Sequence, residues 1–319
     1  MRRYVIRRVA QAIGVLWAAY TVSFLVLDYL PGDPVSAMAG QGADQGTADA
    51  AQLARLKAEY GFDKPVLVQY ADYLGKAVRG DFGDSVATGR PVTSTIADAL
   101  PQTLELAGAA LLLAVIFGGG LALLATYTSL RWLRHALLSL PPLGVSVPTF
   151  WVGLMLVELL SFRARLLPAF GNDGVRGLVL PAVTLAVVSG SMIAQVLSKS
   201  LFTALNEPYV QTAWAKGAGR ARVHLGHALR NASLPALTVL GVLVGQLMAN
   251  SVVVETVFSR NGLGRITASA VSTQDLPVVQ GVIVFGSLVF VAVNLAVDLV
   301  YPLLDPRIVM AGNSRWRLT

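Results

Sequence analysis

Six long apolar runs alternate with polar segments along the chain. The first extends from Val9 to Leu30, and five more follow at about 104–127, 137–160, 178–198, 234–256 and 279–303. A helix of about twenty residues rises roughly 30 Å, which matches the hydrocarbon core of a bilayer. The pattern therefore predicts an all-α polytopic membrane protein with six transmembrane helices.

The composition supports a membrane protein over a soluble one. Of the 319 residues, 55% are hydrophobic and only 13% are charged, and the mean hydropathy is +0.62. A soluble domain carries more charge than this. The chain has no cysteine, which excludes disulfides, thiolate metal sites and cysteine nucleophiles.

The first apolar run could be read as a cleaved signal peptide, because Ala37-Met38-Ala39 imitates a cleavage site. However, the run is longer than the roughly 7–15 apolar residues of a signal core. We interpret it as a transmembrane helix whose N-terminus, with Arg2, Arg3, Arg7 and Arg8, lies inside the cell.

A polar insert at 31–100 separates the first two runs. Pro31-Gly32-Asp33-Pro34 ends the first helix, because proline cannot continue it. Two amphipathic helices are then predicted. The first carries Leu53, Leu56 and Tyr60 on one face, and the second, starting at Pro65, carries Leu67, Tyr70, Leu74 and Val78. A loop follows at 80–85.

The distribution of charge predicts the orientation. With the N-terminus inside, the cytoplasmic segments are 1–8, 128–136, 199–233 and 304–319. They hold fourteen Lys or Arg residues and only two acids, Glu207 and Asp305. The long outer insert holds six basic and nine acidic residues. This asymmetry predicts that both termini are cytoplasmic, and it accounts for the net charge of +7.

The segment Glu207 to Pro235 is a polar and basic island between two apolar runs. Asn206 can cap a helix, and Pro208 is tolerated in its first turn. The predicted helix carries Tyr209, Ala213 and Lys216 along one side, and the chain turns at Gly217 and Gly219. A second short helical segment, 223–232, is expected to lead through Pro235 into the next run.

This island resembles the cytoplasmic coupling loop, or EAA loop, of ABC importer membrane subunits, in the version of dipeptide, oligopeptide and nickel permeases. The matching residues are Tyr209, Thr212, Ala213, Ala215, Lys216, Gly217, His227, Ala228, Leu229, Arg230, Asn231, Ala232, Leu234 and Pro235. Trp214 stands where the family usually has arginine. Shorter motifs extend the likeness over nearly the whole chain, among them 31–34, 61–65, 80–85, 100–104, 180–182, 255–258, 262–265 and 305–307.

The resemblance implies a type I ABC importer transmembrane fold. Its parts would be helix 1 at 1–30, an extracytoplasmic insert at 31–100, the transmembrane domain at 101–305 with a coupling loop at 207–235, and a cytoplasmic tail at 306–319. The implied protein is a non-catalytic permease subunit of the bacterial cytoplasmic membrane. Its residues expected to meet an ATPase are Glu207, Tyr209, Val210, Thr212, Ala213, Trp214, Lys216, Gly217, His227 and Arg230.

The implied partners are a second homologous permease in a heterodimer, two ABC ATPase domains on one or two chains, and an extracytoplasmic substrate-binding protein. The chain has no GxxxxGK[ST] phosphate loop, so ATP and Mg²⁺ are expected on the ATPase domains and not here. The cargo stays open among dipeptides, longer peptides, nickel complexes, glutathione-like molecules and haem.

Two other ligand classes are not expected. His224 and His227 are three residues apart, but His135 is the only other histidine and there is no cysteine, so we expect no metal site. His227 is expected to pack or hydrogen-bond within the loop. The basic residues Lys216, Arg220, Arg222 and Arg230 lack interleaved aromatic side chains, so lipid headgroups or a protein partner are favoured over nucleic acid.

Two acids lie inside apolar runs, Glu158 and Asp298. An ionisable group in hydrocarbon costs several kcal/mol, so such groups usually face a polar cavity or a partner. They are candidates for the translocation path or for a structural hydrogen bond. In the alternative function, an ion-coupled secondary transporter, they would be the coupling acids. Such transporters often have internal repeats, which we do not find here.

Overall fold

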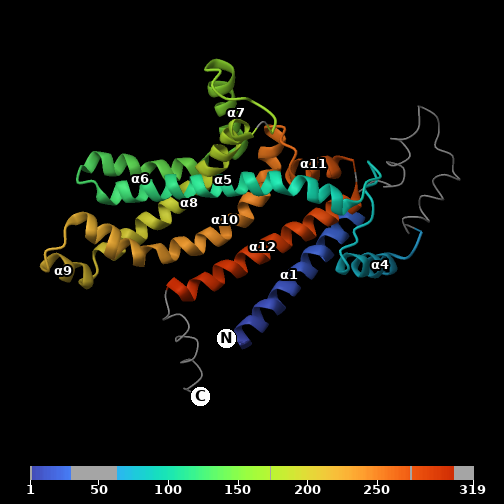
Figure 1. Ribbon diagram of the computed structural model, residues 1–319, viewed down its shortest axis with the longest axis horizontal. Coiled ribbons are helices and arrows are strands. Elements are labelled where there is room, and N and C mark those ends of the chain that lie inside the picture. Colours follow the sequence, from blue (N-terminus) through green and yellow to red (C-terminus); the bar gives the residue numbers. More distant parts are fainter. Residues whose placement is uncertain (1, 30–62, 173, 274, 305–319) are drawn as a thin grey trace. The chain divides into compact units, whose positions relative to one another are not determined.

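The computed structural model describes residues 2–29, 63–172, 174–273 and 275–304 (Figure 1). The described helices are α1 (Arg2–Tyr29), α4 (Val66–Val78), α5 (Val92–Tyr127), α6 (Arg131–Ser146), α7 (Thr149–Leu156), the π-helix η1 (Val157–Arg163), α8 (Gly174–Leu205), α9 (Pro208–Ala215), the π-helix η2 (Arg222–Ala228), α10 (Leu229–Val257), α11 (Leu263–Ser272) and α12 (Leu276–Leu304). The first predicted helix of the insert, with Leu53, Leu56 and Tyr60, lies outside the described residues.

The predicted all-helical membrane class is confirmed. Within the described ranges, five helices are long and apolar enough to cross a bilayer, and a sixth span results if the bent pair Arg131–Ser146 and Thr149–Arg163 is counted as one. The third predicted run, 137–160, is not one straight helix, since this pair is bent by 105°. The two helices are separated at Val147, which has an extended ψ of 129°. The next residue, Pro148, causes this, because proline disfavours the α conformation in the residue before it.

The chain forms two compact units. The first comprises Met1–Gln102 and Asn261–Val291, and the second comprises Thr103–Arg260 and Ala292–Thr319.

In the first unit, α4 packs on α1 through aromatic side chains. The Phe24 ring meets the Tyr70 ring edge-on at 5.4 Å, and the Thr21 and Tyr70 hydroxyls are 2.8 Å apart. The predicted start of α4 after Pro65 is confirmed. Of the predicted apolar face, Tyr70 makes this contact, whereas Leu67 and Val78 are 82% and 81% exposed. The side of α4 that meets α1 is formed by Tyr70 and Tyr73.

The same unit joins the loop at 80–91 to the start of α12. Asp275 accepts hydrogen bonds from the Ser85 hydroxyl at 2.5 Å and from the Ala87 amide at 3.2 Å, and both Ser85 and Asp275 are buried. An apolar cluster beside them includes Val92 and Ile96 of α5. The helix of the second apolar run, expected at about 104–127, therefore starts earlier, since burial of Val92 and Ile96 extends it back to Val92.

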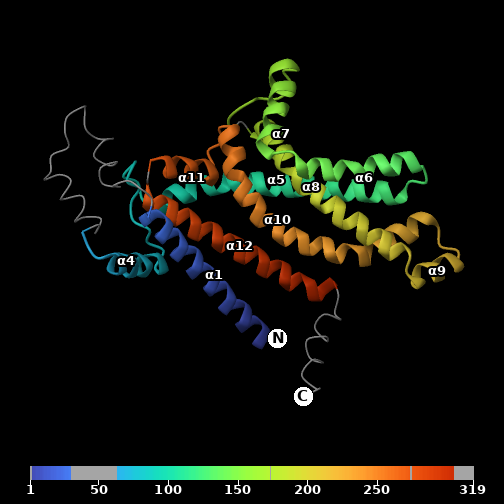
Figure 2. The ribbon, with the colours of Figure 1, turned by 180° about the vertical axis from the view of Figure 1, so that it is seen from behind.

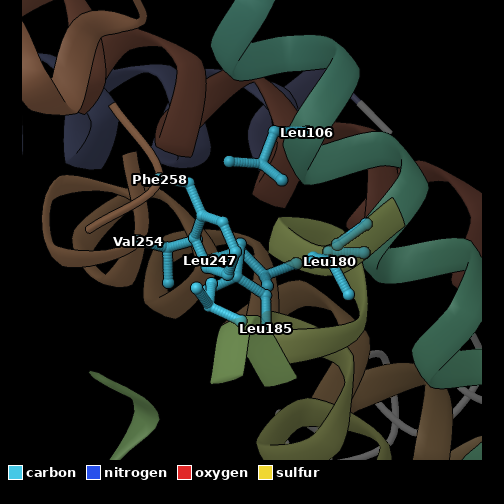
Figure 3. Close-up of a cluster of buried hydrophobic side chains, with 9 residues drawn as sticks. Leu106, Leu180, Leu185, Leu247, Val254 and Phe258 are labelled. Carbon is cyan, nitrogen blue, oxygen red and sulfur yellow. The ribbon is translucent and has the colours of Figure 1, made fainter. Parts of the chain in front are cut away.

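In the second unit, α8 is the central helix and packs against α6, α7 and α10. The α8 helix begins at Gly174, ahead of the predicted opening at Leu180, and keeps Pro181 within it. Its core joins Leu106, Leu180, Leu185, Leu247, Val254 and Phe258 (Figure 3). Phe258 follows the end of α10 and lies among these leucines, which closes one end of the unit.

Helices α5 and α8 approach each other through glycine. A Cβ atom added at Gly118 would lie 2.3 Å from the carbonyl oxygen of Gly190, far closer than real Cβ contacts. The backbones therefore pack in direct contact, which small residues allow between membrane helices.

Candidate functional site

The polar island between α8 and α10 contains the short helix α9, which follows the C-terminal end of α8 (Figures 1 and 2). Pro208 occupies its first turn, as predicted, and Glu207 is the N-cap residue with extended backbone (φ −73°, ψ 148°). The proposed cap, Asn206, is wrong: its side-chain amide donates to the Phe202 carbonyl of α8 at 2.9 Å. The fixed φ of Pro208 starts the helix without a side-chain cap.

The end of α9 is a Schellman motif around Gly217. The Ala218 amide donates to the Ala213 carbonyl at 3.1 Å, and the Gly217 amide donates to the Trp214 carbonyl at 2.9 Å. Gly217 has φ +79°, a left-handed conformation that glycine adopts without steric cost. The predicted turn at Gly217 is confirmed, and it fixes where the rigid helix ends.

One face of α9 is buried against its own chain. Val210 and Ala213 are 1% and 8% exposed, and both pack with Val223, which is fully buried. Ala213 differs in burial from Tyr209 and Lys216, which were expected along the same side and are exposed. Val210 and Ala213 therefore hold the helix in place.

The other predicted coupling residues lie at the surface. Exposed are Glu207, Tyr209, Thr212, Trp214, Lys216, Gly217, His227 and Arg230. Tyr209 and Trp214 are 37% and 45% exposed, so two large aromatic side chains are accessible next to several cations. An exposed helix that combines aromatic and basic side chains is suited to a protein partner.

The segment after the turn is attached to the C-terminal end of α5. The Arg220 guanidinium lies 4.8 Å from the centroid of the Tyr127 ring and donates to the Tyr127 carbonyl. The His224 ring meets the Tyr127 ring edge-on at 5.1 Å, and its Nε2 lies 3.4 Å from the Thr126 carbonyl. The segment after α9 thus contacts α5 as well as the helix that follows it in sequence.

Sequence reasoning missed this attachment. It assigned packing to His227, which is exposed, whereas the packed histidine is His224, 5% exposed. The sequence did contain a sign of this packing, since the small or branched residues Val223, Ala228 and Ala232 form the buried face of the segment. The part of α5 that they approach could not be read from the sequence.

The predicted second helical segment at 223–232 is not a separate element. The π-helix η2 runs directly into α10, and Pro235 lies inside α10. The segment thus continues into a membrane helix without an intervening loop. The π-helical geometry itself is uncommon and is often found at functional positions.

The two proposed path acids are not brought together by any described contact. Glu158 belongs to η1 and pairs with Arg163 at 2.9 Å, with 44% of its side chain exposed. Asp298 lies in α12, and its side chain is outside the described residues. Their role stays a prediction.

A buried charged cluster lies around the other end of α10. Arg260 is 1% exposed, donates to the Gly177 carbonyl at 3.2 Å and lies 3.6 Å from the Glu105 carboxylate. The buried Glu255 accepts from the Thr103 hydroxyl at 2.7 Å. Burial lowers the pKa of Arg260, while the nearby Glu105 and Glu255 carboxylates oppose this shift. The cluster ties α5, the start of α8 and the end of α10 together.

Comparison with known proteins gives a family for this arrangement. A family model described as the inner membrane component of binding-protein-dependent transport systems matches residues 98–310, and a model of the N-terminal part of such components matches residues 1–107. The chain belongs to this family.

Its curated relatives are similar over their full length. A protein of Brucella abortus assigned as a peptide transport system permease is 35% identical over 97% of this chain and 99% of its own. The glutathione transport system permease protein GsiC of Escherichia coli K12 is 36% identical, with the same shares of the two chains covered. The predicted resemblance to peptide permeases is confirmed.

A solved structure supports the fold. The crystal structure of an amino acid ABC transporter with histidines contains a chain that superposes with a TM-score of 0.50 at 17% identity, over 66% of this chain and 94% of that one. The type I importer fold expected from the coupling-loop motif is thus confirmed. This chain is the permease subunit of an ABC importer, a multi-pass protein of the inner membrane that works in assembly with other ABC components. The ion-coupled alternative is set aside.

Proposed function

We propose that this permease moves peptides or peptide-like solutes into the cell, driven by ATP hydrolysis on two partner ATPase domains. The cargo class is supported by the names of its relatives, since glutathione is itself a tripeptide. A second homologous permease would complete the membrane part, and an extracytoplasmic binding protein would deliver the cargo. ATP and Mg²⁺ would be held by the ATPase domains.

The observation that carries the coupling role is that α9 is buried on one face and exposed on the other. Val210 and Ala213 anchor the helix on its own chain, while Tyr209, Thr212 and Trp214 are left exposed. A short helix held by one face and joined to membrane helices at both ends can transmit a displacement without bending. We assign its exposed surface to the ATPase, which also requires both termini and the segment 199–233 to be cytoplasmic.

Cysteine cross-linking tests this assignment directly, because the natural chain has no cysteine. Thr212→Cys places a thiol on the exposed side of α9, and Val175→Cys places one at a 75% exposed position at the other end of α8. In the complete transporter, T212C should cross-link to the ATPase and V175C should not. A T212C variant that transports normally but reacts only with a reagent applied from outside would overturn the orientation and the coupling role.

The cargo is tested by uptake with the complete transporter and its binding protein. We expect uptake of short peptides or glutathione that requires ATP. Glu158→Gln and Asp298→Asn test the path assignment in the same assay, with lowered uptake at unchanged expression as the expected result. Uptake of free metal or haem but no peptide would contradict the cargo class alone.

A further inference from the structure

A groove of about 540 Å³ lies between α6 and α8 in the second unit. It belongs to neither α9 nor the Arg260 cluster. The lining residues are Leu138, Pro141, Ala194, Gln195, Ser198, Lys199, Phe202, Thr203 and Asn206. They include one cation and no acid, so the groove favours an anionic occupant.

Three polar side chains of α8 line the groove without a partner among the described residues; Ser198 is buried, and Gln195 and Lys199 are exposed. Gln195, Ser198 and Lys199 follow the i, i+3, i+4 spacing that places side chains on one face of a helix. No described hydrogen bond involves the side chain of Gln195, Ser198 or Lys199, and no described carboxylate pairs with Lys199. Ser198 is 5% exposed and lines the groove, so its hydroxyl is in position to bond an occupant.

The other two polar residues of the groove are already engaged. Thr203 donates its hydroxyl hydrogen to the Lys199 carbonyl at 3.2 Å, and Asn206 donates to Phe202. Leu138, Pro141 and Phe202 supply an apolar wall beside them. The groove therefore has the Lys199 ammonium and the Ser198 hydroxyl at one side and apolar side chains at the other. This combination matches the headgroup phosphate and the glycerol of a phospholipid.

The depth of Lys199 fits this occupant. It lies six residues before the end of α8, about 9 Å along the helix axis, within reach of the headgroup layer. We propose that this groove binds the headgroup phosphate of an anionic phospholipid of the cytoplasmic leaflet, with the Lys199 ammonium and the Ser198 hydroxyl as donors. Basic pockets between membrane helices on the cytoplasmic side bind such lipids. The site rests on the orientation given under the proposed function.

Native mass spectrometry of the complete transporter in nanodiscs tests the proposal, with phosphatidylglycerol added to phosphatidylcholine as the probe. Lys199→Gln should lower retained phosphatidylglycerol about fivefold, and Lys199→Arg should restore most of it. Arg131→Gln removes a cation from an exposed position at the start of α6, outside the groove, and should leave retention unchanged. Ser198→Ala should give a smaller loss than K199Q.

Equal retention by K199Q and wild type would overturn the site. Loss of the second permease from K199Q on purification would also overturn the site, because the groove would then be a protein interface. The same holds if K199Q lowered uptake equally in membranes without phosphatidylglycerol, because the groove would then be part of the cargo path. The T212C cross-link reports the orientation separately. A normal cross-link with no lipid selectivity would reject only the lipid site, whereas its absence would reject the orientation as well.

Discussion

The guanidinium of Arg220 lies over the ring of Tyr127 and donates to the carbonyl of the same residue. Tyr127 is the last residue of α5, where free carbonyls give the helix end a partial negative charge that attracts cations. Arg220 therefore contacts both the ring and the backbone carbonyl of a residue that lies nearly one hundred positions earlier in the chain.

Arg220→Ala is expected to uncouple ATP hydrolysis from transport. A cation–π contact at an exposed site contributes about 0.5–1 kcal/mol, so the fold should persist while the link to α5 weakens. Uptake per ATP hydrolysed in proteoliposomes should fall several-fold, and Arg220→Lys should recover only part of it, because lysine lacks the planar guanidinium. An unchanged ratio for R220A would mean that α5 receives no motion through this contact.

Gly217→Ala should destabilise the turn after α9, and Gly219→Ala serves as its matched control. Gly217 has φ +79°, whereas Gly219 has no positive φ, and a Cβ atom at either position meets nothing within 4 Å. The left-handed conformation costs an alanine about 1 kcal/mol, while alanine at Gly219 is tolerated. Proteolysis of the segment in the purified protein should be faster for G217A only. Equal cleavage of the two variants would contradict the role of the Schellman motif.

Gly118→Ala is expected to disrupt the crossing of α5 and α8. Its Cβ atom would lie 2.3 Å from the Gly190 carbonyl oxygen, whereas the neighbouring Gly119 and Gly120 have free space. Because backbone and not a flexible side chain blocks the position, the helices must separate, at about 1–3 kcal/mol. Thermal unfolding in detergent should show a lower midpoint for G118A. Gly119→Ala should match the wild type, and a G118A midpoint equal to it would contradict the close crossing.

Asp275→Ala should loosen the loop at 80–91 from the start of α12. The substitution removes the acceptor of the buried Ser85 hydroxyl and of the Ala87 amide, and a buried donor left without a partner costs about 1–3 kcal/mol. Hydrogen exchange should rise at the loop amides. Ser94→Ala, which removes an exposed hydroxyl bonded to the Pro91 carbonyl, is the control and should leave exchange unchanged.

Much of the architecture was predictable because the bilayer imposes it. The length of each apolar run, the helix start at Pro208, the turn at Gly217 and the start of α4 after Pro65 all follow from local rules. The failures occur where distant residues compete with those rules. The second membrane helix starts nine residues before Pro101 because Val92 and Ile96 are buried by α11 and α12, and local propensity contains no information on that cluster.

In the candidate site, too, some features follow from local rules and others depend on distant residues. The exposed residues Tyr209 and Trp214 lie on the predicted short polar helix and Lys216 at its C-cap, since an island of this composition cannot lie in hydrocarbon. The burial of Ala213 was not predicted, because it depends on Val223, ten positions later, which folds back onto α9. Helical spacing gives the angle between side chains but not the side that the rest of the chain covers.

The amino-acid sequence by itself determined the membrane class, the family and the position of the short polar helix between two membrane helices, since these depend on the solvation of apolar and polar stretches and on short-range backbone geometry. Only the tertiary structure decided that the segment is tied to α5 through Arg220 and His224, that α5 and α8 cross at Gly118, and that Lys199 faces a groove without an acid. These features depend on residues far apart in the chain, and the free energy of their contacts exists only once the helices have packed.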